Sequence, residues 1–184
     1  MTPARILAIS GKSGCGNTTV SGILAERLGI RLINYTFRSL AVDMGMDFAA
    51  LLEKAQEDPS FDRTVDEKQV ALAHEADCVV GSRLAMWLLP DAALKVYLWA
   101  SPEVRASRIQ MREGKSLGEI MAFTEKRDGR DHQRYLDLYG IDNDDWSGAD
   151  LTINTEGFSP AQIASIIEAA YRERTGRASG RQGL

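Results

Sequence analysis

The chain has 184 residues, 44% of them hydrophobic, so it is long enough to bury a core and its length fits one domain. Its formal net charge of −4 argues against nucleic-acid binding, which usually shows as an excess of basic residues. The sequence shows no signal-peptide pattern and no apolar run near the roughly 18 to 20 residues of a membrane span, so we expect a cytoplasmic protein without a membrane partner. Two cysteines, Cys15 and Cys78, are too few to indicate a disulfide framework or a metal site.

Apolar runs and their spacing predict five short strands that alternate with helices. The expected strands are residues 5–10, 30–34, 78–80 (ended by Gly81), 94–100 and 150–154. The expected helices are 18–28, several short pieces between 37 and about 76, 102 to about 112, 118 towards 139, and 160–172. This alternation predicts an α/β fold with a mostly parallel sheet, in which ligands bind beyond the carboxyl ends of the strands. The phosphate loop and the turns at Gly81–Arg83, Ser101 and Asn154 follow such ends and are expected to surround one site.

The first strand runs into a glycine-rich loop and a helix. The phosphate-loop pattern is Gly, four residues, then Gly-Lys-Ser/Thr, and Gly11, Gly16 and Thr18 stand at its fixed positions. Asn17 stands where the lysine is usual. Glycines with positive φ and the helix N-terminus can cradle phosphates without a lysine, and the Thr18 hydroxyl is placed to ligate Mg²⁺. The expected ATP-binding residues of this loop are Gly11, Lys12, Ser13, Gly14, Cys15, Gly16, Asn17, Thr18 and Thr19.

Asn17 removes the mobile full charge that normally follows the β- and γ-phosphate oxygens, because asparagine is short and neutral. Lys12, directly after the first glycine, is one candidate replacement. A lysine occupies that position in the variant phosphate loops of septum-positioning and chromosome-partitioning ATPases, which also retain the usual lysine. The alternative is that Lys12 is a solvated loop residue.

Two arginine triplets share one spacing in an otherwise acidic chain. Residues 105–134 hold eight Lys or Arg against five Asp or Glu, a local excess of +3. Offsets of three and seven lie on one face of a helix, so each triplet forms a stripe whose mutual repulsion an anionic ligand would relieve. Asp128 and Asp131 interleave the second triplet, so a salt-bridged, solvated face is the alternative. The triplets are Arg105, Arg108 and Arg112, and Arg127, Arg130 and Arg134.

Several short segments occur in the order and spacing of one known family. They are Phe37-Arg38, Gly45-Met46-Asp47, Glu57-Asp58-Pro59, Asp62-Arg63 with Asp66-Glu67, Arg83 with Trp87, Asp91-Ala92, Arg108 with Arg112-Glu113-Gly114, and Arg134-Tyr135 with Tyr139-Gly140-Ile141-Asp142. From residue 6 to about 170 the chain resembles the nucleoside monophosphate kinases, closest to the short cytidylate kinases typical of archaea.

This resemblance implies a three-layer P-loop NTPase fold with a five-stranded parallel sheet. It implies an acceptor-binding helical insertion at about 35–76 and a helical lid at about 112–134, within a single kinase domain of residues 1–174. Residues 175–184 are expected to form a disordered tail. The implied reaction is transfer of the γ-phosphate of ATP, with Mg²⁺, to CMP or dCMP, and we expect a monomer.

The resemblance also assigns residue roles. It places the acceptor phosphate on Arg38 and Arg83, since a planar guanidinium binds phosphate oxygens bidentately. Arg108 matches the arginine that stacks on the donor adenine. The remaining assignments are the catalytic cations Lys12, Arg112, Arg127, Arg130 and Arg134, and the acceptor-side residues Asp62, Arg63 and Asp66, for which surface salt bridges are the alternative.

The chain departs from the family at Asn17, at the short segment 34–36, and at Gly81-Ser82 where an acidic-glycine pair is usual. Losing one charge-assisted contact in the transition state costs on the order of 3 kcal/mol. Three functions therefore stay open: an active cytidylate kinase with a rebuilt donor site, a nucleotide-binding kinase-like protein with little or no turnover, and a kinase for another small acceptor such as another nucleotide.

Overall fold

The computed structural model of the chain describes residues 3–114 and 116–176, without the side chains of residues 112 and 113. Five strands alternate with eight helices along this part of the chain. The strands are β1 (Ile6–Ser10), β2 (Arg31–Ile33), β3 (Cys78–Gly81), β4 (Leu94–Trp99) and β5 (Leu151–Asn154). The helices are α1 (Asn17–Leu28), α2 (Phe37–Asp43), α3 (Phe48–Glu57), α4 (Ser60–Ala73), α5 (Ala85–Leu88), α6 (Pro102–Glu113), α7 (Leu117–Tyr139) and α8 (Pro160–Thr175).

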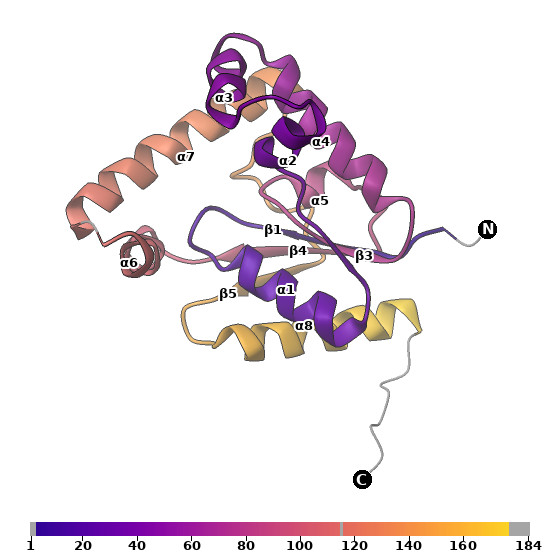
Figure 1. Ribbon diagram of the computed structural model, residues 1–184. Helices are drawn as coiled ribbons and strands as arrows, with labels where there is room; N and C mark the ends of the chain where they lie inside the picture. The colour runs from indigo at the N-terminus through magenta and orange to yellow at the C-terminus, as the bar shows by residue number, and fades with distance from the viewer. Residues whose placement is uncertain (1–2, 115, 177–184) are drawn as a thin grey trace.

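The strands form one parallel sheet in the order β2-β3-β1-β4-β5, which confirms the predicted α/β fold. Figure 1 shows α1 and α8 beneath this sheet and α4 and α5 above it. The central strand β1 is buried on both faces: Leu7 and Ile9 pack in the core of α1 and α8, whereas Ile6 and Ala8 pack towards α4 and α5. Alternate residues of a strand point to opposite faces, and a continuous apolar run therefore suits a sheet covered on both sides.

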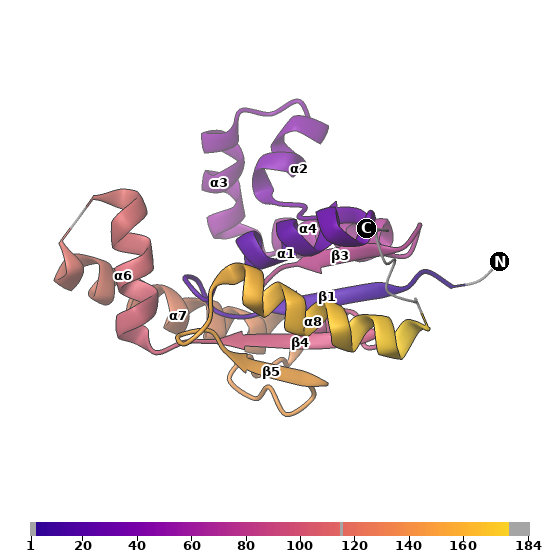
Figure 2. The ribbon, with the colours of Figure 1, turned by 90° about the horizontal axis from the view of Figure 1, so that it is seen from below.

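Two helical groups lie beyond the sheet. Helices α2, α3 and α4 share a small core of Leu40, Leu51 and Val65, and Figures 1 and 2 show α2 and α3 projecting from one side while α6 lies at another. Helix α7 has 23 residues, about 34 Å at 1.5 Å per residue, and links the two groups. It packs on α6 near its start, and near its end the Tyr139 hydroxyl donates to Asp66 of α4 at 2.7 Å.

Besides shifts of about one residue at several element ends, three features differ from those predicted. Gly81 belongs to β3 instead of ending it, and a β-carbon there would lie 2.4 Å from Ser21 Oγ, so glycine allows α1 to pack closely on the strand. The short α5 was not predicted. Helix α8 continues to Thr175, so a tail cannot begin at 175, and residues 177–184 lie outside the described residues. Among the helices of the described chain, none is both long and apolar enough to cross a membrane.

Candidate active site

The loop between β1 and α1 has the backbone of a phosphate cradle. Gly11, Gly14 and Gly16 have φ values of 155°, 87° and 101°, which side-chain-bearing residues rarely adopt. A β-carbon on Gly11 would lie 2.4 Å from the Leu98 carbonyl oxygen, and one on Gly14 would lie 2.8 Å from the Arg105 carbonyl oxygen. Conformation therefore requires all three glycines, and close packing also requires those at positions 11 and 14.

Asn17, at the position of the usual lysine, closes this loop across its base. It is the first residue of α1, and its Nδ2 donates to the Gly11 carbonyl oxygen at 2.8 Å. Its Oδ1 is buried and accepts no hydrogen bond from the described residues. The amide thus holds the two ends of the loop together, whereas a lysine would extend a charge towards the phosphates.

Two arginines of α6 support the outer side of the loop. Arg105 is 5% exposed and its Nη1 donates to the Ser13 carbonyl oxygen at 3.1 Å. Arg108 donates to the Gly14 carbonyl oxygen at 3.2 Å and to the Thr155 carbonyl oxygen at 2.8 Å. Because these arginines bind loop carbonyl groups from α6, the backbone N–H groups can turn to the opposite side, where an anion would bind.

A cleft of about 750 Å³, a size typical of small-molecule sites, lies beyond the carboxyl ends of β1 and β3. All nine predicted loop residues, 11 to 19, line it. The turn after β3 also contributes, as the positions of the strand ends predicted, but Ser101 does not line it. The charged and aromatic side chains that line the rest of the cleft are Tyr35, Phe37, Asp62, Asp66, Arg83, Arg108, Arg127, Arg134, Tyr135 and Phe158.

One end of the cleft lies where α6 meets the turn after β5. Arg108 lines it together with Thr155, Phe158 and Pro160. A guanidinium plane and an aromatic ring are surfaces on which a purine base stacks. Residue-level assignment from the sequence missed Thr155, Phe158 and Pro160, and the only signal for them was the predicted Asn154 turn at the carboxyl end of a strand.

The other end holds an arginine–carboxylate network centred on Asp131, which is 6% exposed. Arg83 Nη1 lies 2.8 Å from Asp131 Oδ2, and its Nη2 donates to Ser13 Oγ at 2.7 Å. Arg134 lies 3.1 Å from Asp131 Oδ1 and 3.4 Å from Asp62 Oδ1. Asp131 thus pairs with arginines, as expected for a salt-bridged helix face. Arg83 and Arg134 nevertheless also line the cleft.

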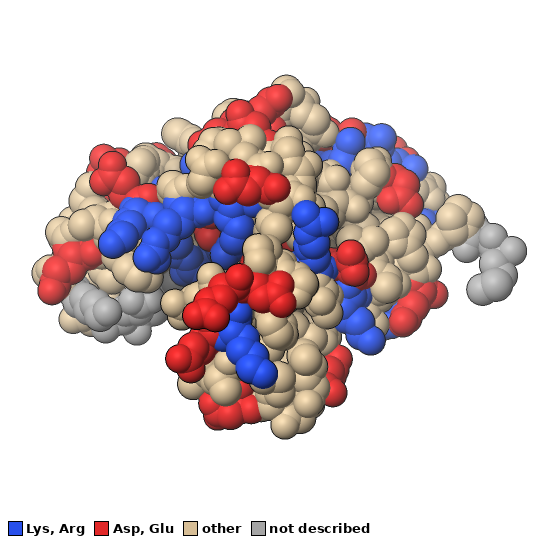
Figure 3. Space-filling view, turned by 90° about the horizontal axis from the view of Figure 1, so that it is seen from above, with Lys and Arg blue, Asp and Glu red and all other residues tan. Residues whose placement is uncertain are grey.

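The cleft is predominantly cationic. Of the described residues that line it, five are Lys or Arg and two, Asp62 and Asp66, are acidic. Burial lowers the pKa of Arg127, and the charge of Arg83 lowers it further. Burial also raises the pKa of both Asp62 and Asp66. Figure 3 shows Lys and Arg gathered on its left, the side where α6 and the start of α7 lie in Figure 1, so this face favours anionic ligands.

Several predicted site residues lie away from the cleft lining. The Arg38 guanidinium stacks over the Phe48 ring at 4.2 Å, and Arg63 donates to the Leu138 carbonyl oxygen at 3.1 Å. Arg130 is exposed on α7 and is not among the residues that line the cleft. Arg112 lies in the last turn of α6, and its side chain is outside the described part of the chain.

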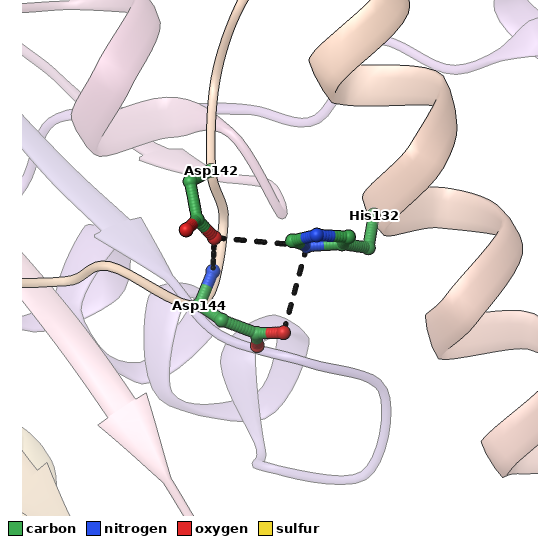
Figure 4. Close-up of side chains that lie close together, drawn as sticks. All are labelled: His132, Asp142 and Asp144. Carbon is green, nitrogen blue, oxygen red and sulfur yellow. Dashed lines mark hydrogen bonds and ion pairs between the residues drawn. The ribbon is translucent and has the colours of Figure 1, made fainter.

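Lys12 lines both the cleft and a second cavity of about 400 Å³ against α6 and α7. Its ammonium group pairs with Asp144, in the segment between α7 and β5. His132, Asp142 and Asp144 place possible metal-ligand atoms within 4.8 Å of one another (Figure 4). Because the Lys12 ammonium already neutralises Asp144, we assign this group to ion pairing and place no metal there.

Comparison with known proteins agrees with this geometry. Residues 6–157 match the sequence model of the cytidylate kinase-like family. Cytidylate kinase 2 of Borreliella afzelii is 41% identical over 172 residues, which are 91% of this chain and 97% of that protein. Cytidylate kinase of Archaeoglobus fulgidus is 42% identical over 164 residues, which are 88% and 91% of the two chains.

Among solved structures, shikimate kinase from Acinetobacter baumannii in complex with shikimate has a TM-score of 0.63 at 18% identity and covers 96% of each chain. An uncharacterized protein from Eubacterium ventriosum has a TM-score of 0.67 at 19% identity and covers 91% of this chain and 98% of its own. These two structures share the fold. The match over residues 6–157 and the identity to the two cytidylate kinases show that the chain belongs to the cytidylate kinase-like family.

Proposed function

We propose that this protein transfers the γ-phosphate of ATP to CMP, giving CDP and ADP. The observation that carries the proposal is that one cleft holds a glycine-rich phosphate loop and, beside it, the guanidinium groups of Arg83 and Arg134, which share the Asp131 carboxylate. A phosphoryl transfer between two nucleotides requires such an arrangement, with a donor phosphate and an acceptor phosphate facing each other. Relatives named cytidylate kinase support CMP as the acceptor.

The reaction needs alignment and charge stabilisation more than covalent help from the protein. The loop N–H groups would hold the β- and γ-phosphates, with Lys12 as the mobile cation, and Arg83 would hold the acceptor phosphate. Arg127 and Arg134 would stabilise the charge on the transferred group. No general base is required, because the acceptor phosphate is already ionised.

Mg²⁺ would accompany ATP. The glycine cradle, which leaves no room for β-carbons at Gly11 and Gly14, fits a triphosphate, and Thr18 lines the cleft at the start of α1. Its hydroxyl would ligate the ion, which would neutralise charge on the β- and γ-phosphates.

The acceptor base would lie near Asp62 and Asp66, which line the cleft on α4, Asp62 beside Arg134. Cytosine presents an amino group that donates hydrogen bonds, whereas uracil presents a carbonyl oxygen at the same position. A carboxylate accepts from the former and is repelled by the latter. Arg38, Arg63 and Arg130 retain their proposed roles only if substrate binding brings them to the cleft, and the proposed role of Arg112 concerns a side chain outside the described part of the chain.

A coupled assay with MgATP and a panel of CMP, dCMP, UMP, AMP, GMP and shikimate tests the proposal. We expect the highest kcat/KM with CMP or dCMP and no turnover of shikimate. Binding of MgATP and CMP without turnover would instead support a kinase-like nucleotide-binding protein. Preference for another acceptor would reject the assignment of Asp62 and Asp66 to cytosine.

A further inference from the structure

The ion pair between Lys12 and Asp144 joins the donor loop to a segment 132 positions further along the chain. The side chains are 25% and 53% exposed, so the pair lies in contact with solvent at the edge of the cleft. A partly exposed pair of this kind is weak and is readily exchanged for another partner. The Lys12 ammonium therefore rests on the Asp144 carboxylate but can move to another anion at little cost.

Asp144 is itself held in place by neighbours on α7 and the sheet. His132 of α7 lies 3.5 Å from its carboxylate (Figure 4). The same ring nitrogen donates to Oδ1 of the buried Asn143 at 2.9 Å. Two residues on, Trp146 stacks on the Tyr97 ring of β4, with centroids 5.4 Å apart. These contacts keep an anion at a constant place beside the loop.

We propose that Asp144 is a positioning residue for ATP, which holds the Lys12 ammonium at the edge of the donor site and yields it to the donor phosphates. The inference rests on the proposed function in assigning ATP to the loop. Two anions, the Asp144 carboxylate and the bound phosphates, compete for one ammonium group. A triphosphate carries up to four charges and wins this competition more completely than a diphosphate does. Each nucleotide must break the pair to the extent that it takes the ammonium, so the pair weakens binding of both nucleotides, ATP more than ADP, and assists their release.

Equilibrium titration of MgATP and MgADP, followed calorimetrically, tests this role. In the Asp144→Asn variant Lys12 has no competing partner, so we expect both nucleotides to bind about two- to fivefold more tightly, MgATP gaining more because it takes the ammonium more completely. Asp142→Asn is the matched control: it removes the same charge from the same segment and lies 3.6 Å from His132, but it is not the partner of Lys12. We expect it to change either affinity much less than Asp144→Asn does.

The same titrations in a Lys12→Ala background show whether the effect of Asp144 on nucleotide affinity acts through Lys12 or through its negative charge alone. There, Asp144→Asn should leave both affinities unchanged. Tightening that persists without Lys12, or that Asp142→Asn reproduces in full, would overturn the proposal. So would an Asp144→Asn variant that folds normally by thermal melting yet binds MgATP no better.

Kinetics with CMP complete the test. Asp144→Asn should lower the KM for ATP while kcat stays within about twofold of the wild-type value, because the residue acts before the chemical step. A large fall in kcat at unchanged KM would overturn the proposal, because Asp144 would then act on the chemical step and not on ATP binding. Nucleotide-binding changes as predicted, with no turnover of CMP by the wild-type protein, would reject the proposed function and leave this inference standing.

Discussion

The side chain of Asn17 donates a hydrogen bond to the carbonyl oxygen of Gly11 across 2.8 Å, so the residue at the lysine position joins the first and last parts of the phosphate loop. A lysine at position 17 would lose this bond. Activity in this chain therefore depends on an ordered loop and on cations supplied from elsewhere, of which Lys12, Arg127 and Arg134 line the cleft.

We predict that Asn17→Asp will be more damaging than Asn17→Ala, although aspartate has the same shape as asparagine. The aspartate has no donor for the Gly11 carbonyl oxygen and places a negative charge beside the phosphates. We expect the KM for ATP to rise more than about tenfold, while the alanine variant loses about 0.5 to 1.5 kcal/mol of stability. Asn17→Lys should also lower kcat/KM. Steady-state kinetics and thermal melting measure these effects. An Asn17→Lys variant more active than wild type would show that the hydrogen bond from the Asn17 side chain to Gly11 is dispensable.

Two glycine substitutions in adjacent elements should have opposite effects on stability. Gly14 has a φ of 87° and no space for a β-carbon, so Gly14→Ala should destabilise the fold by more than about 1 kcal/mol and weaken ATP binding. Gly22 lies within α1, where an added β-carbon would meet nothing within 4 Å beyond its own helical turn, so Gly22→Ala should stabilise by about 0.5 to 1 kcal/mol. Urea unfolding with MgATP titration compares the pair. Equal effects of the two variants on stability would contradict the described loop backbone.

Substitution of Arg83 should impair the use of CMP more than substitution of Arg38 does. Arg83 lines the cleft, so Arg83→Ala should lower kcat/KM for CMP by about a hundredfold or more, and Arg83→Lys should recover little of it because lysine lacks the planar fork. Arg38 packs on Phe48, so Arg38→Ala should raise the KM for CMP by a smaller factor. The assay with CMP at saturating ATP distinguishes them. A larger effect at Arg38 would mean that α2 moves to the acceptor when it binds.

Asp66 gives a prediction for the pH dependence of stability. Burial raises its pKa above the ordinary value of 3.8, so the ionised carboxylate destabilises the fold at neutral pH, and its protonation relieves this as the pH falls. Asp66→Asn should therefore raise the melting temperature at pH 7, and the gain should shrink as the pH falls towards 3.8, while the amide oxygen still accepts from Tyr139. The same variant should bind CMP more weakly. Glu67→Gln, on an exposed neighbour, is the control and should change neither property.

Local patterns in the sequence were sufficient for the sheet and the loop. The apolar run of β1 and the spacing of the glycines depend on residues within one turn or strand of each other, and both were predicted from them. The Lys12–Asp144 pair was not predictable, because it depends on how a segment more than a hundred residues away folds back. The location of Arg38 over Phe48 was missed because a motif match assigns a role but does not orient a side chain.

Arg83 contacts Ser13 of the donor loop with one nitrogen and Asp131 of α7 with the other. A substrate phosphate that binds the Arg83 guanidinium must therefore alter its contact with Ser13 or with Asp131, and so alter the site of the other substrate as well. The two substrates are thus thermodynamically linked, and each should alter the dissociation constant of the other by the same factor. In initial-rate studies this linkage would appear as double-reciprocal lines that intersect away from the substrate axis, a pattern in which neither nucleotide binds independently.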